Sequence, residues 1–335
     1  MKFLKYHSIE NSYRIKTIDA IVEQGLDDGE FVVQEKAHGA NLSFWYDGSS
    51  IKSAKRSGFI DDNFYDYEGV AEKYTGPMEK LYGLLKENKH VFQVMVVYGE
   101  LIGGIYPHKD VSKDTSATRI QKGIFYSPHN DFYAIDMALD GQLLDIDTFS
   151  LFMEQTNFLY AKPIFKGTFQ ECMSYPNKFQ SQIPVWLGLP EINDNCCEGI
   201  VIKPVQPKFF GNSERVVLKN KNEKWAEKAK QKKRPSKQKP VISDAANQLW
   251  ESMEQLVTEN RLRNVISKIG KIEQSDFGKL MAAFSKDALE DFNKDYEDPF
   301  KSLDKKEQKH LSRQLNNACS KRIRANFLNI IDGTF

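Results

Sequence analysis

Cysteine is scarce in this sequence, and its spacing gives no basis for cross-linking. Among the 335 residues there are four cysteines: Cys196 and Cys197 are adjacent, whereas Cys172 and Cys319 lie far from them. This pattern suits neither a disulfide framework nor a pair of metal ligands spaced as CxxC. The cysteine content therefore indicates a reducing, intracellular compartment.

Long apolar runs are also missing. No stretch of the chain is long and apolar enough to cross a bilayer. The first residues, MKFLKYHSIENSYRIK, are interrupted by charge and lack the apolar core of a signal peptide. We therefore expect a soluble protein with no membrane partner. Hydrophobic residues make up 40% of the chain and charged residues 28%, which predicts a globular protein of two domains.

A strong excess of either charge is absent as well, but the charges are unevenly distributed. The formal net charge is +1, yet the run from Lys219 to Lys239 holds ten Lys or Arg and two Glu. The part after Lys228 is typical of a solvated linker, and the whole run also suits a segment that contacts phosphates. In the second interpretation this run and the last helix hold backbone phosphates, and binding weakens steeply with salt.

Residues 1–240 have the pattern of an α+β domain rich in antiparallel sheet. The order of segments differs from the strand–helix alternation of a doubly wound parallel sheet. Turn residues separate short apolar runs, as in antiparallel hairpins around Asp47-Gly48 and Asp140-Gly141. The predicted strands are 31–36, 41–46, 51–56, 91–100, the hairpin 131–146, 199–204 and 214–221, with helices at 117–123 and 147–158.

The composition changes near residue 240. We predict a basic linker at about 224–240 and a separate, all-helical domain at 241–335. Apolar residues recur there at helical spacing: Leu249, Met253, Leu256, Val257, Leu262, Val265, Ile266 and Ile269. Ser243-Asp244 and Ser275-Asp276 have the character of N-caps. A final helix is expected at 304–331, with an outer basic face formed by Arg313, Lys321, Arg322 and Arg324.

Polar groups of unusual content lie at the ends of four predicted strands. They are the segments Glu35-Lys36-Ala37-His38-Gly39-Ala40-Asn41, Lys55-Arg56-Ser57-Gly58, Tyr98-Gly99-Glu100, and Glu198-Gly199 with Lys203, Lys219 and Lys221. Singly, each is common: a lysine at a strand end usually reaches water, and a glutamate there is usually solvated. Together, the cations suit a polyanion, and carboxylates beside phosphates suit Mg²⁺.

Lys36 is the candidate nucleophile of this set, because it follows the apolar stretch FVVQE. A lysine that lies among other cations and is partly desolvated holds its proton less tightly, so its amine can attack. The face of the last strand supports the same site. Val217, Lys219 and Lys221 alternate, so both lysines point the same way. His38 is expected either to orient the loop or to act directly.

In this order the motifs resemble those of the covalent nucleotidyltransferases. The motifs are KAHG at 36–39, Arg56, YGE at 98–100, FYAID at 132–136, EGIVIK at 198–203 and VLKNK at 217–221. Within that superfamily they are similar to the double-strand RNA ligase group, the type 2 RNA ligases and RNA-editing ligases. RNVISKIG at 263–270 and SDFGKLM at 275–281 resemble the helical C-terminal domain of the phage-type members. The resemblance covers nearly the whole chain.

The resemblance implies a chemistry and a role for each residue. Lys36 would form a phosphoamide with AMP from ATP, with Mg²⁺ or Mn²⁺ as the metal, and AMP would then activate the 5′-phosphate of a nicked RNA duplex. Residues around the nucleotide would be Glu35, Ala37 and Asn41 at the adenosine, Arg56 and Glu100 near the ribose and phosphates, Glu198 at the metal, and Lys203, Lys219 and Lys221 at the phosphates. An aromatic residue that stacks on adenine in this group is replaced here by Ile135.

Two alternatives remain beside an ATP-dependent RNA ligase. A DNA ligase or an mRNA capping guanylyltransferase would resemble KxDG rather than KxHG at the nucleophile and would carry an oligonucleotide-binding barrel after the nucleotide domain. A non-catalytic RNA-binding protein on a ligase scaffold would keep the basic residues without needing the nucleophile. We expect RNA as the partner and no obligate protein partner.

Overall fold

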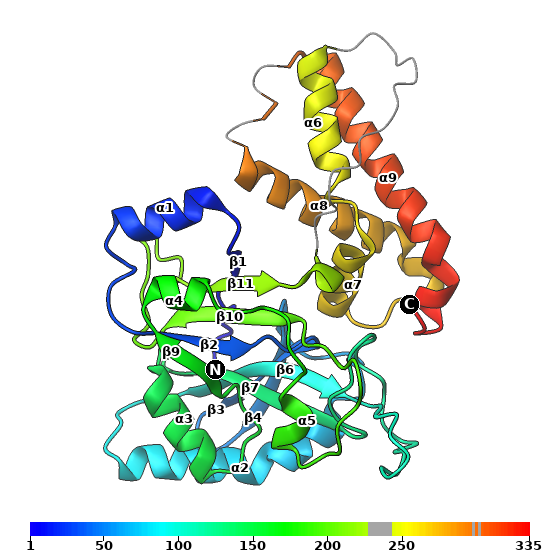
Figure 1. The fold of residues 1–335 in the computed structure, drawn as a ribbon. Helices are drawn as coiled ribbons and strands as arrows, with labels where there is room; N and C mark the ends of the chain where they lie inside the picture. Colours follow the sequence, from blue (N-terminus) through cyan, green and yellow to red (C-terminus); the bar gives the residue numbers. More distant parts are fainter. Residues whose placement is uncertain (227–242, 297–298, 301–302) are drawn as a thin grey trace. The chain divides into compact units, whose positions relative to one another are not determined.

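The computed structural model describes residues 1–226, 243–296, 299–300 and 303–335 (Figure 1). The chain forms two compact units, Met1–Lys224 and Trp225–Phe335. The linker expected at about 224–240 lies almost entirely outside the described residues. None of the helices in these ranges is both long and apolar enough to span a membrane.

The first unit contains two β-sheets, and nearly all of their strand pairs are antiparallel. The five-stranded sheet has the order β1 (Glu10–Asn11), β11 (Leu218–Lys221), β10 (Gly199–Pro204), β2 (Phe31–Glu35) and β9 (Pro163–Gly167). The six-stranded sheet has the order β5 (Gly58–Phe59), β4 (Ile51–Lys55), β3 (Ala40–Tyr46), β6 (Met95–Gly103), β7 (Asn130–Leu139) and β8 (Gln142–Leu143). Among the strands named here, all within the described residues, β1 and β11 pair in parallel, and an isolated bridge between Ala134 and Tyr160 is parallel as well. The predicted α+β class is confirmed.

Residues 36–39 carry the chain from β2 in one sheet to β3 in the other. The turn between the sheets is tight, because a Cβ atom at Gly39 would collide with the carbonyl oxygen of Leu101. A glycine is therefore required where the predicted nucleophile loop passes β6. The loop's position at the junction of the two sheets is what brings motifs from both sheets together.

Both predicted hairpins are present. β3 and β4 pair around a turn in which Asp47 Oδ1 accepts hydrogen bonds from the backbone amides of Ser49 (3.0 Å) and Ser50 (2.9 Å). β7 and β8 are joined by Asp140 and Gly141, whose φ angles of 48° and 85° are those of a type I′ turn. The aspartate and glycine residues therefore direct the turns as expected.

Three local predictions in the first unit are wrong. The strand expected at 91–100 runs instead from Met95 to Gly103. Residues 117–123 form no helix, because side chains hold this segment as a loop: Thr118 N donates to Asn130 Oδ1 (2.9 Å), and Gln121 Oε1 accepts from Gly103 N (3.2 Å). The strand expected at 214–221 is shorter and begins at Leu218. Before it, Val216 N donates to Lys208 O (2.9 Å), which belongs to a loop rather than to the sheet.

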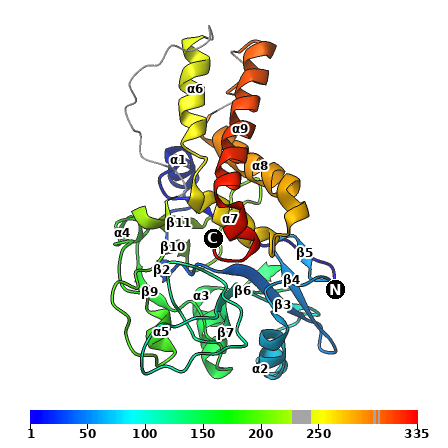
Figure 2. The ribbon, with the colours of Figure 1, turned by 90° about the vertical axis from the view of Figure 1, so that its right-hand side faces the viewer.

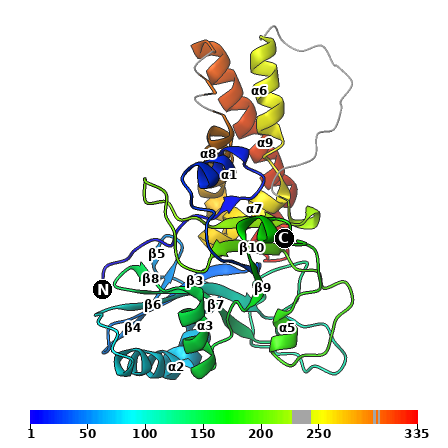
Figure 3. The same ribbon diagram turned by 60° about the vertical axis from the view of Figure 1, so that its left-hand side comes forward.

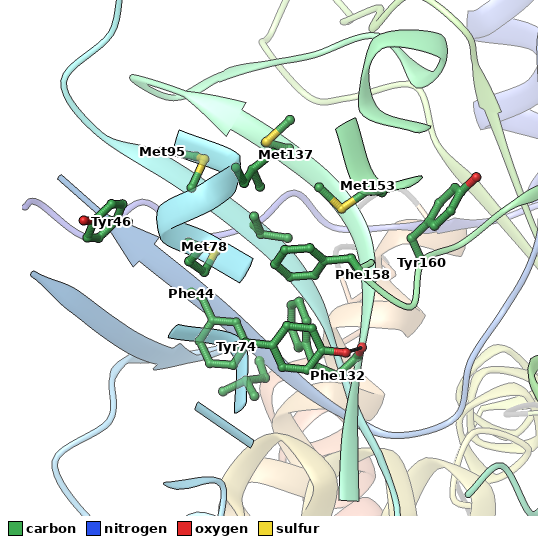
Figure 4. Packing of buried hydrophobic residues seen from close by; sticks show 14 of the residues in the cluster. Phe44, Tyr46, Tyr74, Met78, Met95, Phe132, Met137, Met153, Phe158 and Tyr160 are labelled. Atoms are coloured by element: carbon green, nitrogen blue, oxygen red, sulfur yellow. Dashed lines mark hydrogen bonds between the residues drawn. The ribbon is translucent and has the colours of Figure 1, made fainter. Parts of the chain in front are cut away.

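Helices cover both sheets. On the six-stranded sheet lie α2 (Glu68–Glu87) and α3 (Ile146–Gln155), which contact each other and meet at an angle in Figure 3. α2 contains Pro77 and three glycines and had no helix prediction, yet Val70, Tyr74, Met78, Leu81 and Leu85 form a buried face at helical spacing. Figure 4 shows this packing, in which Tyr74 and Phe132 lie beside Phe44. Tertiary burial thus outweighs weak helix propensity.

The five-stranded sheet is covered by α1 (Ile15–Glu23) and α4 (Phe169–Met173), whose apolar residues share a core with β2 and β10. α4 begins with a capping box in which Thr168 and Glu171 satisfy each other's backbone amides. The remaining short elements are α5 (Ile183–Trp186) and the 3₁₀ turn η1 (Glu223–Trp225).

The described part of the second unit is helical. Its elements are α6 (Asp244–Glu254), α7 (Glu259–Ile269), the 3₁₀ turn η2 (Gln274–Asp276), α8 (Phe277–Asp295) and α9 (Lys305–Ile331), and α6 lies beside α9 (Figure 2). Ser243 caps α6 as predicted, accepting from Ala246 N (3.2 Å). Asp276 does not cap α8 with its side chain, because its carboxylate accepts from Glu273 N (3.0 Å) instead. The predicted apolar positions enter one core, with Met253, Leu256, Val257, Leu262 and Val265 buried.

Candidate active site

Glu198 lies between two lysine ammonium groups that come from different segments. The backbone amide of Lys36 donates to Gly199 O (3.0 Å), which holds the end of β2 against the start of β10. Lys36 Nζ then donates to Glu198 Oε2 (2.9 Å) and to Ala37 O (3.3 Å). Lys221 Nζ lies 2.7 Å from the other carboxylate oxygen of Glu198. The carboxylate therefore bridges the end of β2 and the end of β11.

The Glu198 side chain is 1% exposed, but its two cations are less enclosed: Lys36 is 17% and Lys221 8% exposed. Burial acts to raise the pKa of Glu198, yet the ammonium groups of Lys221 and Lys36 hold that pKa well below its usual value. Glu198 therefore remains an anion at neutral pH. One anion between two cations leaves net positive charge, which a phosphate can neutralise.

His38 stands at the edge of this cluster. Its Nδ1 lies 3.6 Å from Glu198 Oε2, while its backbone amide donates to the buried hydroxyl of Tyr126 (2.9 Å). The residue thus anchors the loop through its backbone and reaches the cluster through its ring. Either predicted role for His38 is compatible with this position.

The six-stranded sheet contributes a second set of predicted residues. Asn41 and Glu100 lie opposite each other in the β3–β6 register, so their side chains leave the same face of the sheet. Burial raises the pKa of Glu100 to about 7, an increase that Lys36 reduces and Glu198 reinforces. This mutual influence places Glu100 in the electrostatic surroundings of the Lys36–Glu198 pair.

Arg56 follows β4 directly, and the N-terminal segment holds its guanidinium group. NH1 donates to His7 O (3.4 Å), and NH2 donates to Ser8 Oγ (3.2 Å). Burial lowers the pKa of Arg56, whereas Tyr6 and Glu100 act to raise it. Arg56 is therefore oriented by residues that precede β1, which sequence reasoning had not associated with the site.

The Glu35 carboxylate faces a different neighbourhood from the adjacent Lys36 ammonium. It is buried and accepts from Ser181 Oγ (2.6 Å) and from Gln182 N (2.7 Å). Burial raises the pKa of Glu35 to about 7, although these hydrogen bonds act to lower it. Its side chain thus fixes the loop before α5, while Ala37 stays buried beside the nucleophile.

Lys203 belongs to a separate, fully enclosed cluster around Asp136. Lys203 Nζ donates to Asp136 Oδ1 (2.9 Å) and to Ile135 O (2.8 Å). Arg215 NH1 donates to Asp136 Oδ2 (2.7 Å) and to the hydroxyl oxygen of Tyr6 (3.1 Å), which in turn donates to Asp136. Arg215 and Lys203 hold the pKa of Asp136 well below its usual range despite burial. Lys203 Nζ is thus bound to a carboxylate and a carbonyl oxygen, and its role at the phosphates stays a prediction.

A β-bulge explains why Lys203 reaches Ile135. Between β6 and β7 the register shifts, so that Tyr98 pairs with Asp136 but Gly99 pairs with Ala134. Ile135 is the extra residue of the bulge, and its carbonyl oxygen accepts a hydrogen bond from Lys203 Nζ. The FYAID segment at 132–136 matches a family motif, but no spacing in the sequence links Asp136 to Arg215 or Tyr6.

Lys219 lies in β11 two residues before Lys221, and the strand places both lysines on one face, as expected. Its backbone carbonyl accepts from Ser12 N (2.9 Å), which attaches the N-terminal segment to β11. Lys219 is partly buried. Five predicted residues therefore interact electrostatically around one carboxylate: Lys36, His38, Glu100, Glu198 and Lys221. Asn41 lies opposite Glu100 in the sheet, and Lys219 lies on the same strand face as Lys221.

A divalent cation has a limited set of protein donors here. Within the described ranges no group of three or more His, Cys, Asp or Glu side chains could hold a metal ion, and all four cysteines are free thiols. Mg²⁺ in nucleotide sites uses one or two carboxylates and takes its other oxygens from phosphates and water. Glu198 and Glu100 fit that donor set when a nucleotide supplies the phosphates.

Family comparisons match both units. The RNA ligase family model matches residues 29–221, and the model for the T4 RNA ligase 2 C-terminal region matches residues 240–321. Mitochondrial RNA-editing ligase 1 of Trypanosoma brucei brucei is 30% identical, with 83% of this chain and 73% of that protein aligned. Mitochondrial RNA-editing ligase 2 of the same organism is 28% identical, with coverages of 88% and 84%.

Solved structures give a more distant likeness. A mutant of the Naegleria gruberi RNA ligase with ATP and Mn aligns at a TM-score of 0.45 and 15% identity. The alignment covers 67% of this chain and 57% of that one. The same ligase with PPi aligns at a TM-score of 0.43 and 14% identity, with coverages of 67% and 58%. This chain therefore spans less than two thirds of those solved chains.

Proposed function

This chain belongs to the RNA ligase family, and we propose that it is an ATP-dependent RNA ligase that seals 3′-OH/5′-phosphate nicks in duplex RNA. The observation that carries the proposal is the placement of Lys36 Nζ on Glu198, with Lys221 on the other oxygen. A candidate nucleophile is thus held beside a second cation, at a position where a phosphate can approach both.

The proposed reaction has three steps. Lys36 Nζ loses a proton and attacks the α-phosphorus of ATP, so that an N–P bond forms, the bond to the β-phosphate breaks and pyrophosphate leaves. A 5′-phosphate oxygen of the RNA then attacks the same phosphorus, which breaks the N–P bond and returns the lysine. Finally the 3′-OH attacks the activated 5′-phosphate, loses its proton and expels AMP. Lys221 and Lys219 stabilise the charge that develops on the phosphate oxygens.

The remaining residues position the nucleotide. Asn41 and the backbone around Glu35 and Ala37 would surround the adenosine, and Arg56 and Glu100 would lie near the ribose and phosphates. Mg²⁺, or Mn²⁺ in its place, would be held by Glu198 with Glu100 nearby, and it would neutralise phosphate charge. Lys203 has a different proposed role: its ammonium fixes the carbonyl of Ile135, so it shapes the segment expected to lie on the adenine.

The second unit weighs against the alternative enzymes. A DNA ligase or capping guanylyltransferase would place a strand-rich barrel after the nucleotide domain, whereas every regular element from Asp244 onward in the described ranges is helical. The non-catalytic alternative is opposed by the pairing of Lys36 with the buried Glu198, since an RNA-binding surface needs no buried carboxylate at its centre.

Covalent labelling tests the proposal directly. Purified protein freed of bound AMP is incubated with a divalent metal and α-labelled ATP or GTP, without RNA, and the denatured protein is examined for label. We expect ATP label that disappears in Lys36→Ala and persists in Lys113→Ala, a control at an exposed loop lysine. GTP label would indicate capping chemistry instead, and no label from folded protein would contradict any ligase activity.

The polynucleotide is tested separately with nicked duplexes of RNA and of DNA. We expect sealing of the RNA nick to exceed sealing of the DNA nick, because duplex RNA is distinguished by its shape and its 2′-hydroxyl groups. Preference for the DNA nick by a protein that labels with ATP would reassign the substrate without affecting the lysyl-AMP step.

A further inference from the structure

Charge in the second unit is segregated by helix. α9 (Lys305–Ile331) contains seven Lys or Arg residues and one acid, Glu307. The helices α6, α7 and α8 together contain eight acids and six Lys or Arg residues. Glu307 Oε1 accepts from the Ser243 backbone amide (2.9 Å), so the single acid of α9 has a capping role. The cationic character of α9 is therefore particular to that helix.

Five of its cations form a line along the exposed face. At 100° per residue they lie within about 120° of arc; they are Lys306, Lys309, Arg313, Lys321 and Arg324, all of them exposed. We name this set the basic stripe. The buried residues Leu311, Leu315, Cys319 and Ile323 lie on the opposite side of the helix. The stripe runs for roughly 27 Å at 1.5 Å per residue.

The side chains of the stripe are largely uncommitted. Lys306, Lys309, Arg313 and Lys321 pair with no carboxylate of the described residues. Arg324 lies over the Phe277 ring, 5.7 Å from its centroid, which orients the guanidinium group. Arg322, which sequence reasoning had grouped with these cations, instead donates to Val257 O (3.3 Å) and lies 3.8 Å from Glu259 Oε1. Arg322 therefore stabilises the helical unit and is not part of the stripe.

The partner that fits this surface is a polyanion with regularly spaced charges. Between the cations lie small polar residues, among them Asn317 and Ser320. Lys, Arg, Asn and Ser are the side chains that contact phosphate and sugar groups, whereas protein interfaces depend on aromatic and apolar anchors. A length of roughly 27 Å passes several successive phosphates of one strand.

We propose that the basic stripe of α9 binds the phosphodiester backbone of the RNA duplex, as a second contact surface in addition to the nucleotide site. The identity of the nucleic acid rests on the proposed ligase function, whereas the charge pattern of α9 supports binding to a polyanion. Contacts of this kind add affinity without sequence preference and with strong salt dependence. Removal of stripe cations should thus affect RNA binding and leave the first chemical step, which needs no RNA, unchanged.

The test uses the full-length double variant R313Q/K321Q and measures binding to a nicked RNA duplex over a range of salt concentrations. We expect the slope of log affinity against log salt to fall by about 2, so the affinity lost between 50 and 200 mM salt shrinks by roughly tenfold. Formation of lysyl-AMP should keep the wild-type rate. Each single variant should change the slope by about half as much.

K279Q/K286Q is the matched control, because it removes two exposed lysines from α8 of the same unit. Its salt slope should equal that of the wild type. An unchanged slope in R313Q/K321Q, or equal changes in both double variants, would overturn the proposal. Failure of ATP labelling in the wild type would instead refute the ligase function, and the salt slopes would still decide whether α9 binds nucleic acid.

Discussion

Two buried carboxylates in the first unit each pair with two cationic side chains, but these cations differ in how far they are exposed to solvent. Glu198 and Asp136 are each 1% exposed, and each is held by two cations. At Glu198 the cations Lys36 and Lys221 are 17% and 8% exposed. At Asp136 the side chains of Lys203 and Arg215 are only 2% and 1% exposed. One cluster is therefore open to an incoming anion, and the other is closed.

The difference separates a reactive cluster from a supporting one. Around Asp136 the chain joins β7, β10, the segment before β11 and, through Tyr6, the N-terminal segment. A closed cluster gains stability from complete pairing but cannot exchange its carboxylate for a ligand. The Glu198 cluster keeps one anion between two cations that reach the surface, so phosphate oxygens can enter. Variants that interfere with each cluster measure this difference as a change in the free energy of unfolding.

Asp136→Asn should have the largest effect. It leaves Lys203 and Arg215 buried without a carboxylate, which should lower the free energy of unfolding by about 3 to 5 kcal/mol. Urea denaturation measures the loss. Asp147→Asn is the control, because Asp147 pairs with Lys166 at the surface (3.1 Å) and such pairs contribute less than about 1 kcal/mol. Equal losses in the two variants would show that the Asp136 cluster is not a support.

The closed cluster around Asp136 also contains contacts that the sequence does not predict. The side chains of Lys36, Glu198 and Lys221 meet, as strand ends and motif order indicated, and their roles in the reaction stay predictions. The partner of Lys203 was missed, because it depends on a bulge at Ile135 and on a carboxylate that is distant in the chain. A motif specifies which residues occur, whereas the register of two strands decides which atoms meet.

The same limit applies to neighbours on one strand. Glu35 and Lys36 were grouped in one site because they are neighbours in sequence. Adjacent side chains at a strand point to opposite faces, and their charged groups have different partners. The α+β class and the helical second unit followed from turn residues and apolar spacing, which are local signals. The loop at 117–123 did not, because the backbone amide of Gly103 in β6 and the side chain of Asn130 in β7 hold it.

Glu35→Gln extends the comparison to a buried carboxylate that pairs with no cation of the described residues. The folded pKa of Glu35 is raised from 4.5 to about 7, so the folded state binds the extra proton between these values. Stability therefore falls as pH rises through this window, and the deficit is complete above pH 7. The variant should be more stable than wild type by about 3 kcal/mol at pH 8 and nearly equal to it at pH 4.5. Urea denaturation at both pH values gives the difference, and the same difference at both would contradict the assignment.

Lys203→Met should have an intermediate effect, because Asp136 keeps Arg215 and Tyr6 as partners. We expect a loss of about 2 kcal/mol in the free energy of unfolding and ATP labelling within tenfold of wild type at a temperature where the variant is folded. Lys221→Met is the comparison in the open cluster: its stability should change less and its labelling should fall by more than a hundredfold. Loss of labelling by Lys203→Met with unchanged stability would restore the phosphate role that the resemblance implied.

Glu198→Gln should have the smallest effect on stability, about 1 kcal/mol, because Lys36 and Lys221 can reach water and the amide oxygen still accepts a hydrogen bond. With the anion removed, the two ammonium groups form a stronger site for another anion. Pyrophosphate in metal-free buffer should therefore raise the unfolding midpoint of Glu198→Gln more than that of the wild type. Asp136→Asn should show no such gain, because its cations are enclosed and pyrophosphate cannot reach them. Equal stabilisation of all three proteins by pyrophosphate would show that the open and closed clusters do not differ in their access to anions. It would also contradict the proposal that Lys36 and Lys221 hold the phosphates of a nucleotide.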